Sequence, residues 1–244
     1  MKKILAEGHR GYASKYPENT LISFEAAMEL GVDAIEFDVW LSKDGVPVLI
    51  HDGSCKRTCG VDCHVNDMTV AQIKTLSAHY AEKFGDQYAA MHVTIPTLEE
   101  LLKLRQRKQP DLLLGVEIKE YTEACVDKTV ALLKAYGVFD LCFFYAFDAK
   151  IIRYLCTRYD ARTMGYPDFQ MRNHQPDSYR FYKELGLDLK YVRSEIFPVY
   201  KEKGLPMHMY CADNEDDVRM CIEKGADLIT ANDPVPLLRV LGKL

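Results

Sequence analysis

The feature that most constrains the fold is an alternation of short apolar runs with amphipathic helical patterns along the 244-residue chain. This alternation is typical of βα units arranged around a parallel sheet. The predicted strands are Ile4–Glu7, Ala34–Val39, Pro47–Ile50, Leu113–Ile118, Leu141–Tyr145, Arg162–Gly165, Lys190–Val192, Met207–Cys211 and Asp227–Thr230. The predicted helices are Leu21–Leu30, Leu98–Arg107, Glu123–Tyr136, Ala149–Tyr159, Ser178–Leu185, Glu215–Lys224 and Val235–Leu241. A capping box at Thr97 and Glu100 supports the second helix.

Nine predicted strands compete for the eight places of an α/β barrel, so one is an edge strand, a hairpin partner or a wrong prediction. The suspect region is 39–48, where the connection is too short for a crossover helix and leaves a hairpin or an extended crossover. Residues 53–96 break the alternation with turn residues, one helical stretch and a weakly patterned tail. We expect one catalytic barrel domain over residues 1–244, with 53–96 inserted over one mouth.

Charge and apolar content exclude several classes of protein. The 31 basic and 36 acidic residues give a net charge of −5, which offers no general footprint for nucleic acid. No apolar run approaches the roughly 20 residues that span a bilayer. The opening residues have a three-residue apolar stretch, whereas a secretory signal needs about 7–15. We therefore expect a cytoplasmic protein without stable membrane insertion.

The eight cysteines favour buried or free thiols over disulfides, since the chain is large and lacks an export signal. Cys55, Cys59, Cys63 and His64 fall close together in the inserted segment. Their spacing does not match the C-x₂-C pairs of common zinc sites, so free thiols on a loop are favoured over a metal site.

Three acidic residues are predicted to meet inside the barrel. Glu36 and Asp38 lie two apart on one strand and project from the same face. Because two buried like charges repel, this pair calls for a cation, and Glu117 on another apolar strand is the natural third ligand. Carboxylate oxygens suit a hard divalent cation, Mg²⁺ or Ca²⁺. The alternative is that the acids line a polar loop or pair with basic residues.

Two histidines follow predicted strands near the same mouth. His9 and His51 have the imidazole chemistry to act as acid and base on opposite sides of one reacting centre. Singly, each could be a structural histidine. Arg10 and Lys119 add positive charge for a phosphate, the first by a two-pronged contact and the second as a point charge. Salt bridges to the acidic ligands are the alternative for both, and the two roles are compatible.

The motifs HRG, PENT, ExD, KDG and HD occur jointly in the run HRGYASKYPENTLISFEAAMELGVDAIEFDVWLSKDGVPVLIHD. They continue through RTCG, IPTLEELL, GVEIK, YAFD and GADLITANDP, and so cover essentially the whole chain. These motifs and their order resemble the glycerophosphodiester phosphodiesterase family.

The resemblance implies a barrel of the triosephosphate isomerase type with a short insertion after the third strand. It implies cation-dependent hydrolysis of small glycerophosphodiesters to glycerol 3-phosphate and an alcohol, through attack by the substrate's own glycerol hydroxyl and a cyclic phosphate that water opens. The resemblance implies that the metal ligands are Glu36, Asp38 and Glu117. It implies that the acid–base histidines are His9 and His51, that Arg10 contacts the phosphate and that Lys119 is the active-site lysine.

The chain departs from the family pattern at the rim of the expected site. The usual Trp-Thr-Val-Asn run reads Tyr-Cys-Ala-Asp at 210–213, and the usual Ser-Ser-Phe reads Tyr-Ala-Phe at 145–147. These positions put the alcohol preference in doubt more than the reaction type. Trp40, Phe147 and Tyr210 are candidates for an apolar wall around the glycerol or its substituent, with core packing as the alternative.

Two other functions are kept open. One is a related barrel that cleaves or cyclises whole phospholipids, which would need an apolar membrane-facing rim. The other is a non-catalytic barrel that binds a phosphate ligand or a partner protein. The presence of both histidines and all three acids argues against the second. The head group, the ion and the oligomeric state stay undetermined by the sequence.

Overall fold

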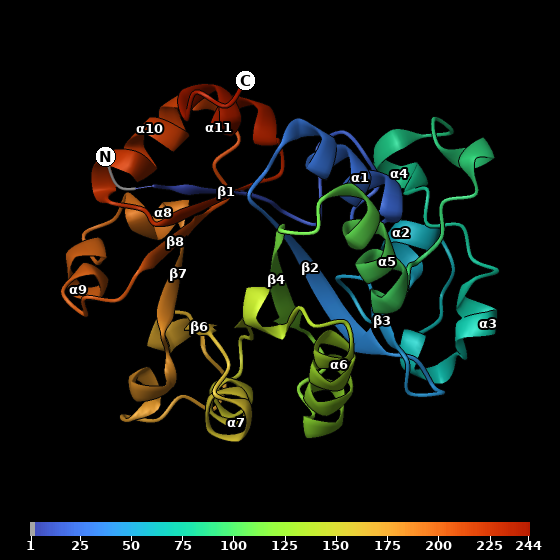
Figure 1. The fold of residues 1–244 in the computed structure, drawn as a ribbon, viewed down its shortest axis with the longest axis horizontal. Coiled ribbons are helices and arrows are strands. Elements are labelled where there is room, and N and C mark those ends of the chain that lie inside the picture. The colour runs from blue at the N-terminus through green and yellow to red at the C-terminus, as the bar shows by residue number, and fades with distance from the viewer. Residues whose placement is uncertain (1–2) are drawn as a thin grey trace.

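The structure is a computed structural model that describes residues 3–244, and its centre is a closed barrel of eight parallel strands (Figure 1). The opening residues, from which we predicted that the chain has no secretory signal, include residues 1–2, which lie outside the described residues. The barrel strands are β1 (Leu5–Gly8), β2 (Ala34–Leu41), β4 (Leu113–Ile118), β5 (Cys142–Tyr145), β6 (Thr163–Gly165), β7 (Glu184–Asp188), β8 (Met207–Tyr210) and β9 (Leu228–Ala231). They pair in this order, and β9 pairs with β1 to close the ring. The predicted barrel of the triosephosphate isomerase type is confirmed.

Helices surround the barrel on its outer side (Figure 1). They are α1 (Leu21–Leu30), α5 (Leu98–Lys108), α6 (Glu123–Ala135), α7 (Ala149–Tyr159), α8 (Leu189–Val192), α9 (Phe197–Lys201), α10 (Glu215–Lys224) and α11 (Pro234–Val240). The predicted capping box is present, since Thr97 Oγ1 accepts from the Glu100 N–H at 3.2 Å and Glu100 Oε2 accepts from the Thr97 N–H at 2.7 Å.

The ninth predicted strand is a hairpin partner. Strand β3 (Pro47–Leu49) pairs antiparallel with the end of β2, with Trp40 opposite Val48. The turn is short because the Ser42 N–H donates to the Val46 carbonyl at 2.9 Å, and Gly45 supplies the left-handed backbone there (φ 73°). The hairpin, not an extended crossover, therefore connects 39 to 48. The insertion follows β3, which is third along the chain and lies outside the barrel.

One predicted strand and one predicted helix are wrong, both within residues 178–192. The strand β7 comes earlier than predicted, residues 189–192 form α8, and Ser178–Phe181 makes only a 3₁₀ turn. Gly186 faces the barrel interior, where a Cβ would lie 2.7 Å from the ring of Tyr166. The inward-facing positions of β7 are Glu184, Gly186 and Asp188. This strand therefore lacks the continuous apolar run by which buried parallel strands were predicted. Asp188 then starts α8 by accepting from the Lys190 N–H at 2.8 Å.

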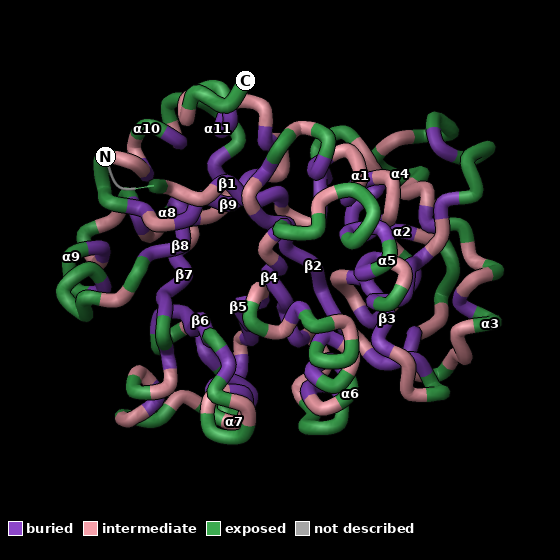
Figure 2. The backbone as a smooth tube through the Cα atoms, in the orientation of Figure 1, coloured by how far each residue is buried: buried purple, intermediate pink, exposed green. Residues whose placement is uncertain are grey.

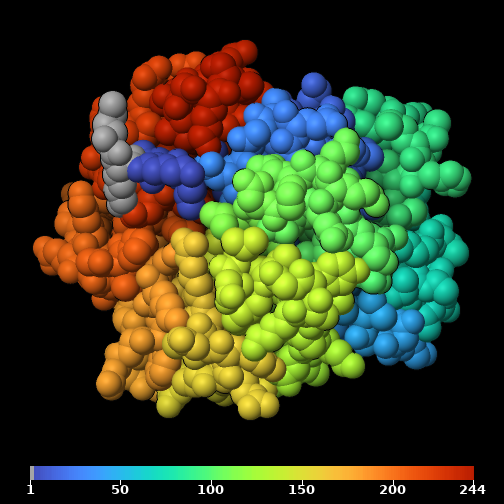
Figure 3. Space-filling view, viewed as in Figure 1, coloured from blue at the N-terminus to red at the C-terminus, as the bar shows by residue number. Residues whose placement is uncertain are grey.

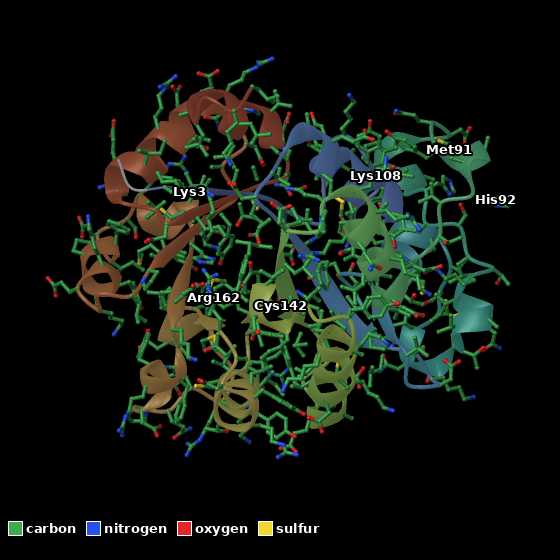
Figure 4. The ribbon with its side chains drawn as sticks, in the orientation of Figure 1. Lys3, Met91, His92, Lys108, Cys142 and Arg162 are labelled. Atoms are coloured by element: carbon green, nitrogen blue, oxygen red, sulfur yellow. The ribbon has the colours of Figure 1, made fainter. Side chains whose placement is uncertain are left out.

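The inserted segment packs as a small layer beside β3 and carries α2 (Lys56–Cys59), α3 (Val70–Ile73) and α4 (Ala81–Phe84) (Figure 1). Met91 and His92 lie at its outer edge, away from the barrel (Figure 4). Lys83 Nζ and Tyr88 Oη donate to backbone carbonyls of the loop after β1, at 2.7 and 2.6 Å. The inserted segment and the end of the hairpin share an apolar cluster, which is made by Val48, Ile50, Cys55, Val65, Ile73, Ala78, Tyr88, Val93 and Ile95.

Burial follows the barrel closely. The strands are almost entirely buried, and exposed residues lie on the outer helices and loops (Figure 2). The first and last parts of the chain lie side by side in the space-filling view, in keeping with the pairing of β1 and β9 (Figure 3). Among residues 3–244, no helix is long and apolar enough to span a membrane.

Candidate active site

The three predicted acidic ligands come together inside the barrel. The register of β2 and β4 places Asp38 beside Glu117, and Glu36 projects from the same face of β2. All three are buried, with Glu117 the most exposed at 6%. One carboxylate oxygen from each lies within 4.8 Å of the others. This spacing is close enough for one ion to contact all three.

Burial and mutual repulsion shift the acid–base behaviour of the trio. Burial, with the neighbouring Asp38 and Glu117, holds the pKa of Glu36 well above its ordinary value. Burial also raises the pKa of Glu117. Burial acts on Asp38 in the same direction, but the cations of Arg10 and Lys119 outweigh it and its pKa lies below the ordinary value. The protein's own cations therefore favour ionisation of Asp38 but do not offset burial and repulsion at Glu36 and Glu117, whose ionised forms a bound cation would stabilise.

One oxygen of the trio has no partner. Within the described chain, Oε1 of Glu36 is buried and accepts no hydrogen bond, and Oδ1 of Asp38 accepts none but faces Lys119 Nζ at 3.5 Å. Buried polar atoms are almost always paired, so the unpartnered Glu36 oxygen beside two further carboxylates marks a position for a cation. An all-oxygen donor set fits Mg²⁺ or Ca²⁺ better than it fits softer ions.

His9 follows β1 directly and points an open ring nitrogen at the trio. Its Nδ1 lies 2.7 Å from Asn232 Oδ1, while the amide nitrogen of Asn232 donates to Asp213 at 2.8 Å. Since this contact fixes which way the amide faces, Nδ1 of His9 must donate. Its Nε2 lies 3.8 Å from Glu36 Oε2. Burial and the adjacent Arg10 lower the pKa of His9 to about 4.

His51 follows β3 and reaches the same cavity from the other side. Its Nδ1 lies 2.7 Å from Asp52 Oδ1, and because an ionised carboxylate only accepts, Nδ1 donates. Its Nε2 is left as an acceptor and lies 3.1 Å from Lys119 Nζ. Both imidazoles therefore present Nε2 to the side of the cavity where the carboxylates lie.

Arg10 and Lys119 are held by carboxylates, as the salt-bridge alternative expected. The guanidinium of Arg10 places Nε 3.3 Å from Asp38 Oδ2 and donates from Nη1 to Glu18 at 2.9 Å, while the backbone N–H of Arg10 donates to Glu36 at 3.0 Å. Lys119 Nζ lies 3.0 Å from Glu117 Oε1 and 3.5 Å from Asp38 Oδ1. Both side chains also line the cavity, so a phosphate could contact them there.

The cavity has a volume of about 600 Å³, and aromatic side chains form part of its wall. Phe147 and Tyr210, which were predicted to form an apolar wall, both line the cavity. Tyr166 also lines it, and its ring stacks on Phe147 with 3.8 Å between ring centres and meets Tyr210 edge-on at 5.9 Å. Trp40 is not among the lining residues. Its indole N–H donates to the His51 carbonyl at 3.2 Å, and its ring packs against His64, so it supports the histidine loop from behind.

Sequence reasoning assigned no individual role to four residues that hold or line the site. Asn19 donates to Asp38 at 2.7 Å and lies in the PENT motif. Asp52 and Asn232 orient the two histidines, and Tyr166 extends the aromatic wall. Asp52 is adjacent to His51, and Tyr166 directly follows a predicted strand, so both could have been proposed from position alone. Asn232 could not, because its contact joins opposite ends of the chain.

In the described part of the chain, the cysteines of the inserted segment do not place three ligand atoms close enough together for one ion. Across residues 3–244, the acidic trio is the group whose ligand atoms approach closely enough for an ion, and Cys55, Cys59 and Cys63 are free thiols. The ring of His64 is turned toward Trp40, at 5.3 Å between ring centres.

Comparison with known proteins agrees with this geometry. The model of the "Glycerophosphoryl diester phosphodiesterase family" matches residues 9–235. A glycerophosphodiester phosphodiesterase of Caldanaerobacter subterraneus subsp. tengcongensis is 30% identical over 99% of both chains. One of Bacillus subtilis is 28% identical, over 95% of this chain and 84% of that protein.

Solved structures share the fold. A phosphodiesterase of Oleispira antarctica, in complex with the product sn-glycerol-3-phosphate, superimposes with a TM-score of 0.83 at 23% identity, over 98% of this chain and 96% of that one. A glycerophosphodiester phosphodiesterase of Agrobacterium tumefaciens gives a TM-score of 0.77 at 24% identity, over 95% and 97% of the two chains. Together with the family match and the 30% identical relative, the barrel and its cavity lead to one conclusion: this chain belongs to the glycerophosphoryl diester phosphodiesterase family and is an enzyme of that kind.

Proposed function

We propose that this enzyme hydrolyses small glycerophosphodiesters to glycerol 3-phosphate and an alcohol, with a divalent cation held by Glu36, Asp38 and Glu117. The observation that carries the proposal is that three buried carboxylates and the Nε2 atoms of two histidines border one cavity. A cation bound there would polarise the phosphodiester and offset its negative charge.

The protein's own residues supply the remaining steps. Arg10 and Lys119 border the cavity and would bind phosphoryl oxygens, stabilising the charge that builds on them. The wall of Phe147, Tyr166 and Tyr210 would exclude water from the organic part of the substrate and orient it.

The two histidines differ in a way that assigns their first roles. Asp52, a carboxylate, supports a positive charge on His51, whereas the neutral amide of Asn232 gives His9 no such support. We therefore assign His51, once it is protonated at Nε2, as the proton donor to the departing alkoxide, and His9, whose Nε2 carries no proton, as the acceptor of the proton from the attacking oxygen. In a second step that opens a cyclic phosphate, the proton transfers would run in reverse.

The test is turnover of glycerophosphocholine, followed by release of glycerol 3-phosphate and choline. Parallel reactions with phosphatidylcholine vesicles separate the phospholipid-cleaving alternative from the proposal. Preference for the small diester supports the proposal, and preference for vesicles would replace it with the alternative. Binding of glycerol 3-phosphate without turnover of either compound would favour a non-catalytic barrel.

A further inference from the structure

The side chain of Arg57, on α2 of the inserted segment, contacts the partners of two proposed active-site residues at once. Its Nε donates to Asp52 Oδ2 at 2.5 Å, and Nη1 and Nη2 donate to the two carboxylate oxygens of Glu18 at 3.0 and 2.8 Å. Asp52 is the partner of His51, and Glu18 is the partner of Arg10. One guanidinium thus links the partner of His51 to the partner of Arg10.

We propose that Arg57 is a positioning residue for the phosphodiesterase reaction, which orients His51 through Asp52 and Arg10 through Glu18. This inference rests on the proposed function for the reaction that Arg57 supports, whereas the contacts of Arg57 with Asp52 and Glu18 are observed directly. In this reading the inserted segment is part of the catalytic apparatus, although Arg57 itself is not among the residues that line the cavity.

Arginine is the side chain that this position requires. The planar guanidinium has donors directed outward in a fixed fork, and Arg57 uses Nε, Nη1 and Nη2 against two separate carboxylates. A lysine ammonium has the charge but cannot span both partners from one nitrogen. Only the fork can hold Asp52 and Glu18 in a fixed relation.

The inserted segment holds Arg57 in place through Tyr80. The Tyr80 hydroxyl accepts from Arg57 Nη1 at 3.0 Å, and its ring lies 5.3 Å from the guanidinium carbon. The Tyr80 N–H donates to the Thr58 carbonyl at 3.0 Å, which ties the start of α4 to α2. Tyr80 has a positive φ of 55°, a conformation that a non-glycine residue keeps only when its surroundings impose it.

The charges around Arg57 are arranged so that both carboxylates stay ionised. Burial would raise the pKa values of Glu18 and Asp52, but their arginine and histidine partners outweigh it and both lie below their ordinary values. Asp52 divides its charge between Arg57 and His51. Loss of Arg57 would leave that charge to His51 alone and would also let Asp52 rotate.

The test compares Arg57→Ala and Arg57→Lys with a matched control, Arg153→Ala. Arg153 also lies over an aromatic ring, Phe181 at 4.8 Å, and pairs with Asp177 at 3.7 Å, but on the outer helix α7. Two readouts are needed: steady-state kinetics with glycerophosphocholine, and the titration of the His51 imidazole followed by NMR in the full-length protein.

We expect Arg57→Ala to lower kcat by roughly 100-fold, the upper range for residues that orient catalytic groups. Added guanidinium should restore part of this loss, and Arg57→Lys should restore less than tenfold. The His51 titration should differ from that of the wild type, because Asp52 would no longer share its charge with Arg57. The other charged groups that face His51 are unchanged in the variants, namely Asp38, Glu117 and Lys119. Arg153→Ala should alter neither readout.

A His51 titration equal to that of the wild type, with kcat unchanged or lowered only as far as in Arg153→Ala, overturns the inference. If Arg57→Ala does not fold, kcat of Arg57→Lys decides, because this variant keeps the charge and the stem and loses only the fork, and its kcat should lie at least about tenfold below that of the wild type. If the wild-type enzyme does not turn over glycerophosphocholine, the proposed function fails, while the His51 titration still decides whether Arg57 acts through Asp52.

Discussion

The two halves of the barrel mouth are built on different principles. On the side of β1 to β4, charged residues hold one another: His9, Arg10 and Lys119 each lie within 4 Å of an acid of the trio. On the side of β5 to β8, the rings of Phe147 and Tyr166 make the wall by stacking, with Tyr210 edge-on. Hydrogen-bonded charges fix atoms to fractions of an ångström, whereas stacked rings fix a shape.

The difference indicates a division of labour. A phosphodiester presents the same phosphorus chemistry whatever its alcohol, so the group that transfers protons must be rigid and can be common to many substrates. The aromatic side of the mouth contacts the alcohol portion of the substrate and therefore determines which substrate is used. We therefore expect changes on the charged side to lower kcat and changes on the aromatic side to act mainly through KM.

The largest effect is expected for His51→Ala. Loss of a general acid should lower kcat by about 10³-fold, within the range of roughly 10²–10⁴ for such groups. His92→Ala, at the exposed outer edge of the inserted segment, is the control and should keep full activity. Rates near those of the wild type, in a folded His51→Ala enzyme, would remove His51 from the mechanism.

Next comes Glu117→Gln, which exchanges one carboxylate of the trio for an amide. We expect turnover to fall by at least about 100-fold at low divalent-ion concentration, with partial recovery as Mg²⁺ or Ca²⁺ is raised. Ion binding can be followed separately by calorimetry. Glu99→Gln on α5, which removes an exposed partner of Lys103, is the control. Unchanged ion affinity in Glu117→Gln would place the cation elsewhere.

A smaller effect is expected for Arg10→Lys. The variant keeps one positive charge but loses the fork that contacts Glu18 at 2.9 Å and lies 3.3 Å from Asp38. Loss of one charge-assisted hydrogen bond predicts a decrease in kcat/KM of about tenfold or more. Michaelis kinetics with glycerophosphocholine measure it. Kinetics identical to those of the wild type would exclude a two-pronged contact with phosphate.

The smallest effect is expected on the aromatic side. Phe147→Leu removes a stacked pair worth about 0.5–1.5 kcal/mol, which predicts a rise in KM of roughly 2–10-fold with kcat nearly unchanged. Tyr166→Phe keeps the stack and should have little effect. A fall in kcat as large as that in His51→Ala would end the distinction between the two halves.

Sequence reasoning located the charged half because the positions of its residues follow simple rules, while the roles of these residues stay predictions. Glu36 and Asp38 share a strand face by their spacing, and His9 and His51 each directly follow a strand. The barrel followed from alternation, and the hairpin at 39–48 was one of two alternatives that the chain left open. Local pattern was sufficient in these cases.

The aromatic half and the supporting contacts were harder to predict for a physical reason. Tyr166 meets Phe147 and Tyr210 only because β5, β6 and β8 are bent into one ring. The apolar rule also failed on β7, which turns Gly186 toward the interior to make room for Tyr166. Contacts between distant segments are set by the closed barrel and leave little trace in any short window.

The most direct test of the account is ³¹P NMR of glycerophosphocholine with enzyme stripped of metal by a chelator, before and after Mg²⁺ or Ca²⁺ is restored. The account predicts no reaction in the stripped enzyme and a glycerol 3-phosphate signal once either ion is present. A glycerol 3-phosphate signal at full rate in excess chelator would contradict the central claim, that three buried carboxylates hold a cation between two histidines.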